Sequence, residues 1–358
     1  MTKFYGILFL IGLLLVSCAK DDGLTALDTE SVVHYDLENM PFSTLSEYQF
    51  FQGELKNLEP SHGVLPYTLN ATLFSDYAKK KRFIWMPNQS KAAYVSDDQM
   101  LDFPRGTILI KNFYYDNVRP DYSTQIIETR LMIKKEAGWV FANYKWNALQ
   151  SEAELDLNGS FVPLEWEEND EVKSVEYRIP SEAECHTCHK IMETAQPIGP
   201  KPRNLNLTFQ ADEGLQNQLD YLVEFGYLDN SLPETIYQLP DYTDTSVPLI
   251  QRVRAYLEIN CAHCHSDYTH CSYRPMRFDY SLTDDFANMG VCVDADTPLG
   301  EDLERIVTPG DARSSVLYYR LSATEPSTRM PLLARTLVHT EGLQLVEAWI
   351  ESLDMNCN

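Results

Sequence analysis

The chain has 358 residues, of which 44% are hydrophobic and 11% aromatic, and its formal net charge is −24. This length allows two or three domains of ordinary size, and the apolar content is too high for wholesale disorder. A polyanion of this size repels the phosphates of nucleic acids, so we expect no nucleic-acid partner. The charge suits solubility or a basic protein partner.

The N-terminal 17 residues form a segment of their own. Lys3 is followed by an apolar run, Phe4 to Val16, that is too short to cross a bilayer comfortably. The run ends in Leu15-Val16-Ser17-Cys18, which resembles the lipobox of lipoproteins and implies that Cys18 carries the lipid. The alternatives are an uncleaved membrane helix and an ordinary signal peptide beside an incidental cysteine. We expect an exported protein that a lipid anchors to the outer membrane, on its periplasmic or cell-surface side.

The next two segments differ in composition and in the pattern of their apolar residues. Residues 18–44 are acidic and polar, which predicts a tether between the lipid and the folded body. Residues 45–180 contain short β-branched and aromatic runs separated by turns, which predict an all-β domain, an antiparallel sandwich or barrel. The predicted strands are Arg82–Met86, Thr107–Tyr115, Thr124–Lys134, Trp139–Trp146 and Val172–Ile179, with a hairpin turn at 135–138.

After Pro180 the sequence favours helices and loops, in two segments, 181–240 and 241–358. Both are predicted to be all-α. The predicted helices are a short one at 181–184, one at Leu215–Phe225 that Gly226 ends, one at Pro248–Asn260, one that ends near Leu321, and one that starts at Thr340.

Two pentapeptides of the form C-x-x-C-H carry the clearest chemistry, and this form is the attachment pattern of c-type haem. They are Cys185-His186-Thr187-Cys188-His189 and Cys261-Ala262-His263-Cys264-His265. In this pattern each thiol adds to one vinyl group of the porphyrin, and the adjacent histidine binds the iron. The alternatives are a zinc site built from two C-x-x-C pairs and a thioredoxin-like redox pair. We expect two covalently bound haem c groups.

Three cysteines lie outside the N-terminal segment and outside both motifs. Cys271 and Cys292 fall in one stretch after the second motif, so they are the candidate disulfide in an oxidising compartment. Cys357 would then be unpaired, and it is the alternative partner for either cysteine.

The segment around the second motif resembles a class I cytochrome c. It has a helix before the motif, a distant Met330-Pro331 and a C-terminal helix with an aromatic residue. This resemblance implies that His265 is the proximal ligand of the iron and Met330 the distal one. Met276 and Met289 are the alternatives for the distal position.

The distal ligand of the first haem stays open. His189 is the expected proximal ligand, and Met192 is too close to it in the chain to reach the opposite face of the ring. The candidates are His62, His270 and a methionine of the β-rich domain, or an iron left open to a small ligand. His186 and His263, inside the motifs, are expected to face solvent.

A stiff loop beside the first motif carries two cations. Lys201 and Arg203 lie in the Pro-Ile-Gly-Pro loop region that follows His189. They are candidates to pair with the haem propionates, and ordinary solvent-facing charge is the alternative.

From about residue 65 onward the chain resembles a family of diheme c-type cytochromes of mostly undefined role. Besides both haem motifs and the Pro-Ile-Gly-Pro loop, the resemblance rests on Leu65-Pro66-Tyr67, Leu73-Phe74-Ser75-Asp76, Phe103-Pro104-Arg105-Gly106-Thr107, Glu128-Thr129-Arg130 and Tyr144-Lys145-Trp146-Asn147. Related segments are joined to quinoprotein sugar-dehydrogenase-like domains, which implies an electron-acceptor role. The expected fold is an N-terminal all-β domain followed by all-α cytochrome c-like haem domains.

Three functions follow from these features. The first is electron transfer as acceptor or relay for a periplasmic or surface dehydrogenase, with a redox protein as partner. The second is a peroxidase-like haem enzyme that uses an open first haem. The third is a surface binding module, in which aromatic residues of the β-rich domain stack on sugars; the candidates are Trp85, Tyr114, Trp139 and Trp146.

Overall fold

The computed structural model describes residues 31–211, 214–297, 299–300 and 302–357. Cys18 and the predicted signal segment lie outside the described residues. Within the described part of the chain, no helix is both long enough and apolar enough to cross a membrane.

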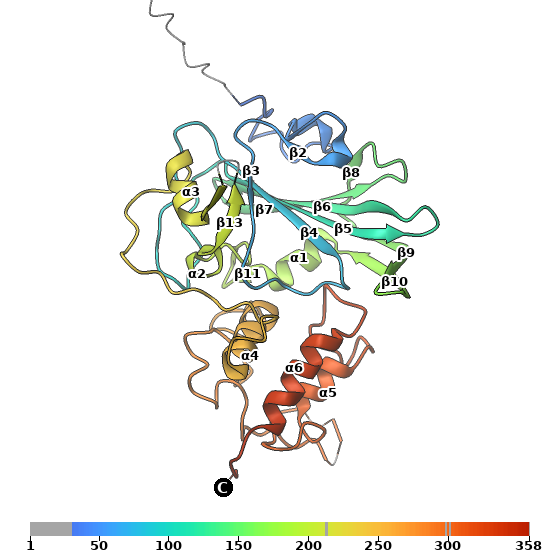
Figure 1. The fold of residues 1–358 in the computed structure, drawn as a ribbon, viewed down its shortest axis with the longest axis vertical. Coiled ribbons are helices and arrows are strands. Elements are labelled where there is room, and N and C mark those ends of the chain that lie inside the picture. Colours follow the sequence, from blue (N-terminus) through green and yellow to red (C-terminus); the bar gives the residue numbers. More distant parts are fainter. Residues whose placement is uncertain (1–30, 212–213, 298, 301, 358) are drawn as a thin grey trace, which may run out of the picture.

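An eight-stranded antiparallel sheet is the largest element (Figure 1). Its strands are β3 (Leu65–Tyr67), β4 (Lys79–Trp85), β5 (Ile108–Val118), β6 (Ser123–Lys135), β7 (Gly138–Trp146), β8 (Ala153–Leu155), β9 (Ser160–Glu168) and β10 (Glu171–Ile179). The order is β10-β9-β5-β6-β7-β8, and β4 pairs with β5 and with β3. Strand β9 joins β5 only at Val118↔Trp166, beyond the end of β4.

Both faces of this sheet are covered, which explains the continuous apolar runs in its strands. Ile108 and Ile110 of β5 pack with an N-terminal segment that starts at Val33. Leu109 faces the other side, where it packs with residues of the segment after Pro180, such as Leu219. The chain therefore packs against the sheet well before residue 45, inside the region predicted to be a tether.

Short elements complete the β-rich part. Before the sheet come the 3-10 helices η1 (Ser46–Tyr48) and η2 (Leu55–Asn57) and the two-stranded ladder of β1 (Phe51–Gln52) and β2 (Glu59–Pro60). After it come α1 (Glu182–Cys188), β11 (Lys190–Ile191), β12 (Thr194–Ala195), α2 (Pro202–Leu205), β13 (Thr208–Ala211), β14 (Gly214–Asn217) and α3 (Gln218–Phe225).

The C-terminal part lies beside this body and has its own core (Figure 1). It contains α4 (Leu249–Leu257), the π-helical turn η3 (Glu258–Ala262), α5 (Val316–Ser322) and α6 (Thr340–Glu351). Tyr256 of α4 packs closely against Gly342 of α6, where a side chain would meet the tyrosine hydroxyl. The long stretch between η3 and α5 is irregular, and a disulfide joins it to the chain end through Cys292 and Cys357.

The expected fold class is wrong, although every predicted strand is present. The strands form one sheet with a branched order instead of a closed sandwich or barrel. The predicted all-α haem domains are absent from the described residues, which are 28% strand and 18% helix. Segment 181–240 carries two β-hairpins, and the six α-helices have only 4 to 12 residues each. The prediction failed because a C-x-x-C-H pentapeptide fixes one turn of backbone and leaves the surrounding fold undetermined.

Candidate functional site

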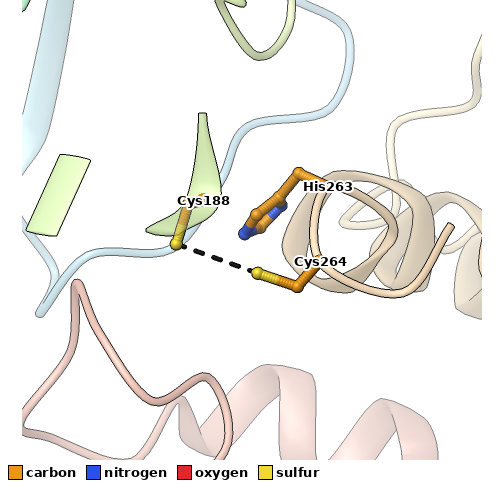
Figure 2. Close-up of side chains that lie close together, drawn as sticks. All are labelled: Cys188, His263 and Cys264. Carbon is orange, nitrogen blue, oxygen red and sulfur yellow. Dashed lines mark hydrogen bonds between the residues drawn. The ribbon is translucent and has the colours of Figure 1, made fainter. Parts of the chain in front are cut away.

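The two C-x-x-C-H motifs meet between the sheet and the C-terminal part. The first motif occupies the last turn of α1, whose start is fixed by a capping box between Ser181 and Glu184. The second begins in η3, directly after α4. Figure 2 shows the result: the Sγ atoms of Cys188 and Cys264 lie 3.8 Å apart, beside the ring of His263. Residues 76 positions apart in the chain thus form one group.

The thiols of this group differ in acidity. The Cys264 thiol donates a hydrogen bond to Cys188, which together with His263 holds the pKa of Cys188 well below its usual value. The same pairing and burial raise the pKa of Cys264. Burial raises the pKa of Cys185, and that of Cys261 to about 12. Cys188 is therefore the thiol of the four that most readily gives up its proton, and the thiolate is the reactive form.

His189 is oriented by the hairpin of β11 and β12. Its Nδ1 lies 2.9 Å from the carbonyl oxygen of Gln196. Since a carbonyl oxygen can only accept, Nδ1 carries the proton and donates a hydrogen bond to that oxygen. The lone pair then lies on Nε2, the arrangement found in histidines that bind metals. Burial lowers the pKa of His189 to about 3, which keeps the imidazole neutral.

His265 is held differently. Its side chain is buried and packs edge-on against Phe278, with ring centroids 5.5 Å apart. Burial lowers its pKa to about 4. The buried Nδ1 atoms of His265 and His263 have no hydrogen-bond partner among the described residues. Unpartnered buried nitrogens are unusual in folded proteins and point to a group that binds there.

The second motif opens onto a cavity of about 100 Å³. Cys261, Cys264, His265 and Met330 all line it, and most of the remaining wall is apolar, with side chains such as Phe278. An apolar lining with a few polar groups is typical of sites for organic ligands. The cavity thus brings together the residues that the sequence assigned to the second haem.

Of the two alternative distal ligands for the second haem, only one lines the cavity. Met276 lines the same cavity as Met330. Met289 is fully buried in the core of the C-terminal part and does not line it.

The first motif opens onto a second cavity, of about 90 Å³. Cys185, Cys188 and His189 line one side of it, and the sheet forms another wall. The two cavities meet, because Cys188 and His263 line both of them.

The candidates for the distal ligand of the first haem differ in whether they line this cavity. Met132 of β6 lines it, whereas His62 is exposed elsewhere and His270 lines the other cavity. His263, which the sequence placed toward solvent, instead lies at the junction. Sequence reasoning missed it because position x of a C-x-x-C-H motif has no fixed orientation.

Two other expectations change. Lys201 pairs with Glu258, and Arg203 pairs with Asp98 at 2.8 Å, so neither cation is available to another anion. The disulfide joins Cys292 to Cys357, the alternative partner, and Cys271 stays a buried free thiol. Spacing alone favoured Cys271 because it is nearer to Cys292 in the chain.

The comparisons with known proteins found no match: no family model, no curated protein and no solved structure matches this chain. The expected membership of a diheme c-type cytochrome family, and the resemblance to class I cytochrome c, are therefore wrong by this measure. The mostly β structure, with 18% helix, also differs from an all-α cytochrome fold. The motif chemistry is a separate matter, since the two thiols and the adjacent histidine of each pentapeptide are the groups that attach c-type haem.

Proposed function

We propose that this chain is an exported c-type cytochrome that carries two covalently bound haem groups and transfers electrons, as acceptor or relay for a periplasmic or surface dehydrogenase. One observation carries the proposal: each C-x-x-C-H motif opens onto a cavity of its own, and the two cavities meet at Cys188 and His263.

The residues on the walls fit haem. Cys185 and Cys188 would hold the first group, and Cys261 and Cys264 the second. Bound haem supplies one-electron chemistry, because its iron cycles between the ferric and ferrous states. His189 presents a neutral Nε2, oriented by Gln196.

The second site has the same features with one addition. His265 is buried and neutral, and Met330 lines its cavity from the loop after α5. His265 and Met330, if both held the iron, would favour rapid electron exchange over substrate chemistry.

The adjoining cavities support electron transfer in particular. The attachment points at Cys188 and Cys264 are in contact, 3.8 Å apart. Groups held at these two residues would lie next to each other, so an electron could pass between them without a second protein. This arrangement suits a relay.

A single metal ion is the second candidate. The ligand atoms of Cys188, His263 and Cys264 lie within 4.8 Å of one another, and no other such group occurs among the described residues. Two thiolates and an imidazole are ligands that Zn²⁺ prefers. This site and haem attachment exclude each other, because both need the same two sulfur atoms. The zinc hypothesis leaves Cys185, Cys261 and both cavities without a role.

The other two functions are less favoured by the structure. Met132 and His263 line the cavity of His189, so a peroxidase-like open iron has two competing side chains close by. Trp85, Trp139 and Trp146 are buried in the core and are not available to stack on sugars, whereas Tyr114 is half-buried.

The deciding experiment measures haem content after expression in a host that can attach haem c. We expect two haems per chain by pyridine haemochrome assay and by mass of the denatured protein. The double variants Cys185→Ser/Cys188→Ser and Cys261→Ser/Cys264→Ser should each lose one haem. Cys271→Ser is the matched control, since this thiol is free but lies outside both motifs, and it should keep two.

Two results would contradict the proposal. A colourless protein from a competent host would exclude haem. A protein that holds one zinc ion, and loses it in His263→Ala, would instead support the metal site. Reduction by a dehydrogenase donor, with no turnover of peroxide, would distinguish a relay from an enzyme.

A further inference from the structure

A row of polar side chains crosses five strands of the sheet and faces the cavity of the first motif. The strand register sets its members directly opposite one another, so they point to the same face. All of them line the cavity that holds His189. The row is Tyr67 in β3, Arg82 in β4, Lys111 in β5, Arg130 in β6 and Asn143 in β7.

Only one of the three cations in this row has a carboxylate partner. Arg130 donates to both carboxylate oxygens of Glu128, through Nε at 3.0 Å and Nη2 at 2.6 Å. Arg82 and Lys111 form no ion pair with any described residue. Lys111 Nζ instead lies 4.8 Å from the centroid of the Phe113 ring.

The cavity offers no other acid to these two cations. Its one lining carboxylate, Glu184, is committed to Arg178 at 2.7 Å and to the cap of α1. Arg82 is only 6% exposed, and burial lowers its pKa. Burial, and after it repulsion from Arg82 and Arg130, lowers the pKa of Lys111. Buried charges in proteins are normally paired, because an unpaired charge loses its hydration without compensation.

We propose that Arg82 and Lys111 bind the carboxylates of the group held at the first motif, which are the propionates of the first haem. This inference rests on the function proposed above. Guanidinium and ammonium groups form strong charge-assisted hydrogen bonds with carboxylates, and arginine does so through two parallel bonds. The role that the sequence gave to Lys201 and Arg203 thus passes to two residues of the sheet.

The proposal gives the β-rich part a function. The first motif holds one side of the group through α1, and the sheet binds its anionic side from the opposite wall of the cavity. The cations also favour the reduced state, which carries one positive charge less on the iron. Removal of either cation should therefore lower the reduction potential of the first haem.

The test compares charge-removing variants in the haem-loaded full chain. Arg82→Gln and Lys111→Gln should keep two haems, because the thioethers still hold them, while the potential of one haem shifts downward. The double variant should shift further. Loss of a cation also raises the pKa of a propionate, so the pH dependence of that potential should move to higher pH.

Two further variants make the result specific. Lys81→Gln removes the same charge from the neighbouring position of β4, where the side chain is exposed on the other face, and it should leave both potentials unchanged. Arg82→Lys keeps the charge and should retain most of the wild-type potential. If Arg82→Gln and Lys111→Gln match Lys81→Gln while two haems are present, the inference fails alone. If the wild-type protein carries no haem, the proposed function and the inference fail together.

Discussion

The carboxylate of Asp76 accepts a hydrogen bond from the backbone N–H of Leu337 at 2.8 Å, across 261 residues of sequence. It also accepts from the backbone N–H of Thr336 at 2.7 Å and from its hydroxyl at 3.0 Å. Asp76 is 2% exposed and precedes β4, whereas Leu337 follows the loop of Met330. One buried side chain thus ties the sheet to the segment that forms a wall of both cavities.

Asp76→Ala should destabilise the protein strongly. It leaves two partly buried N–H groups without an acceptor, and the expected loss in the free energy of unfolding is about 3 kcal/mol. Urea unfolding of the full chain measures this. The exposed Asp121 supplies the control, since Asp121→Ala should change stability by less than about 0.5 kcal/mol. Equal effects of the two variants would show that the Asp76 contacts do not hold the two parts together.

The second prediction concerns the buried carboxylate of Glu128. It is fully buried, accepts two hydrogen bonds from Arg130, and accepts one from the Tyr177 hydroxyl at 2.7 Å. Glu128→Ala leaves Arg130 buried without a counter-charge, which should cost about 3 to 5 kcal/mol of stability. Tyr177→Phe removes one hydrogen bond and should cost about 1 to 1.5 kcal/mol.

Chemical denaturation of both variants checks this order. The half-exposed pair of Lys173 and Glu168 is the matched control, because a solvated ion pair contributes little. Glu168→Gln should cost less than about 1 kcal/mol. If Glu128→Ala proved no worse than Glu168→Gln, the Glu128 network would have no structural role.

The strands were predictable because their signal is local. Residues 107–115 and 124–134 are long β-branched and aromatic runs, and strands buried on both faces need only such runs to be recognised. The helical parts were harder. Helix α1 has seven residues and α2 has four, and these are too short to show a period or to specify a domain. The prediction of all-α domains therefore depended more on the two C-x-x-C-H motifs than on the pattern of the surrounding sequence.

The residues of the candidate site were likewise predictable mainly where they are adjacent in sequence. Cys185, Cys188 and His189 are adjacent in sequence, and the pattern identified them at once. Arg82 and Lys111 lie in different strands, and only the register of β4 against β5 brings them together. A single sequence does not specify that register, so the nearer cations Lys201 and Arg203 were favoured instead. The contact of Cys188 with Cys264 likewise depends on how the C-terminal part packs.

The third prediction concerns the disulfide between Cys292 and Cys357, which closes a loop with a sequence separation of 65. A covalent link of this kind restricts the unfolded chain, and its removal should cost about 2 to 4 kcal/mol. We expect Cys292→Ser/Cys357→Ser to lower the melting temperature measured by circular dichroism. Peptide mapping without reductant should show the 292–357 link in the wild-type protein.

Cys271→Ser provides the control for this pair. Its thiol is free, so the variant should retain the 292–357 link and most of the stability. A mapped link between residues 271 and 292 would contradict the structure. The single variant Cys357→Ser would also expose Cys292 to pairing with Cys271, which the double variant avoids.

The last prediction is a pH dependence that arises from His339. Its ring stacks on Phe74 with centroids 4.1 Å apart, and its Nδ1 lies 3.3 Å from the Tyr256 hydroxyl. Burial lowers the pKa of His339 from 6.5 to about 4. The unfolded chain therefore takes up the proton first as the pH falls. The contribution of His339 to the free energy of unfolding should be fully present above pH 6.5. It should decrease between pH 6.5 and 4, by on the order of 2 kcal/mol.

Unfolding free energies at several pH values measure this slope. His339→Phe fills a similar volume without a titrating group, so its stability should depend less on pH between 6.5 and 4 than that of the wild-type protein. His34→Phe removes an exposed histidine that stacks on Phe42, and it should keep the wild-type slope in this range. Because His339 is outside both haem motifs, the comparison can be made on the haem-loaded chain. A slope that His339→Phe leaves unchanged would mean that another group causes the acid sensitivity, and that His339 accepts its proton without opening the packing of α4 against α6.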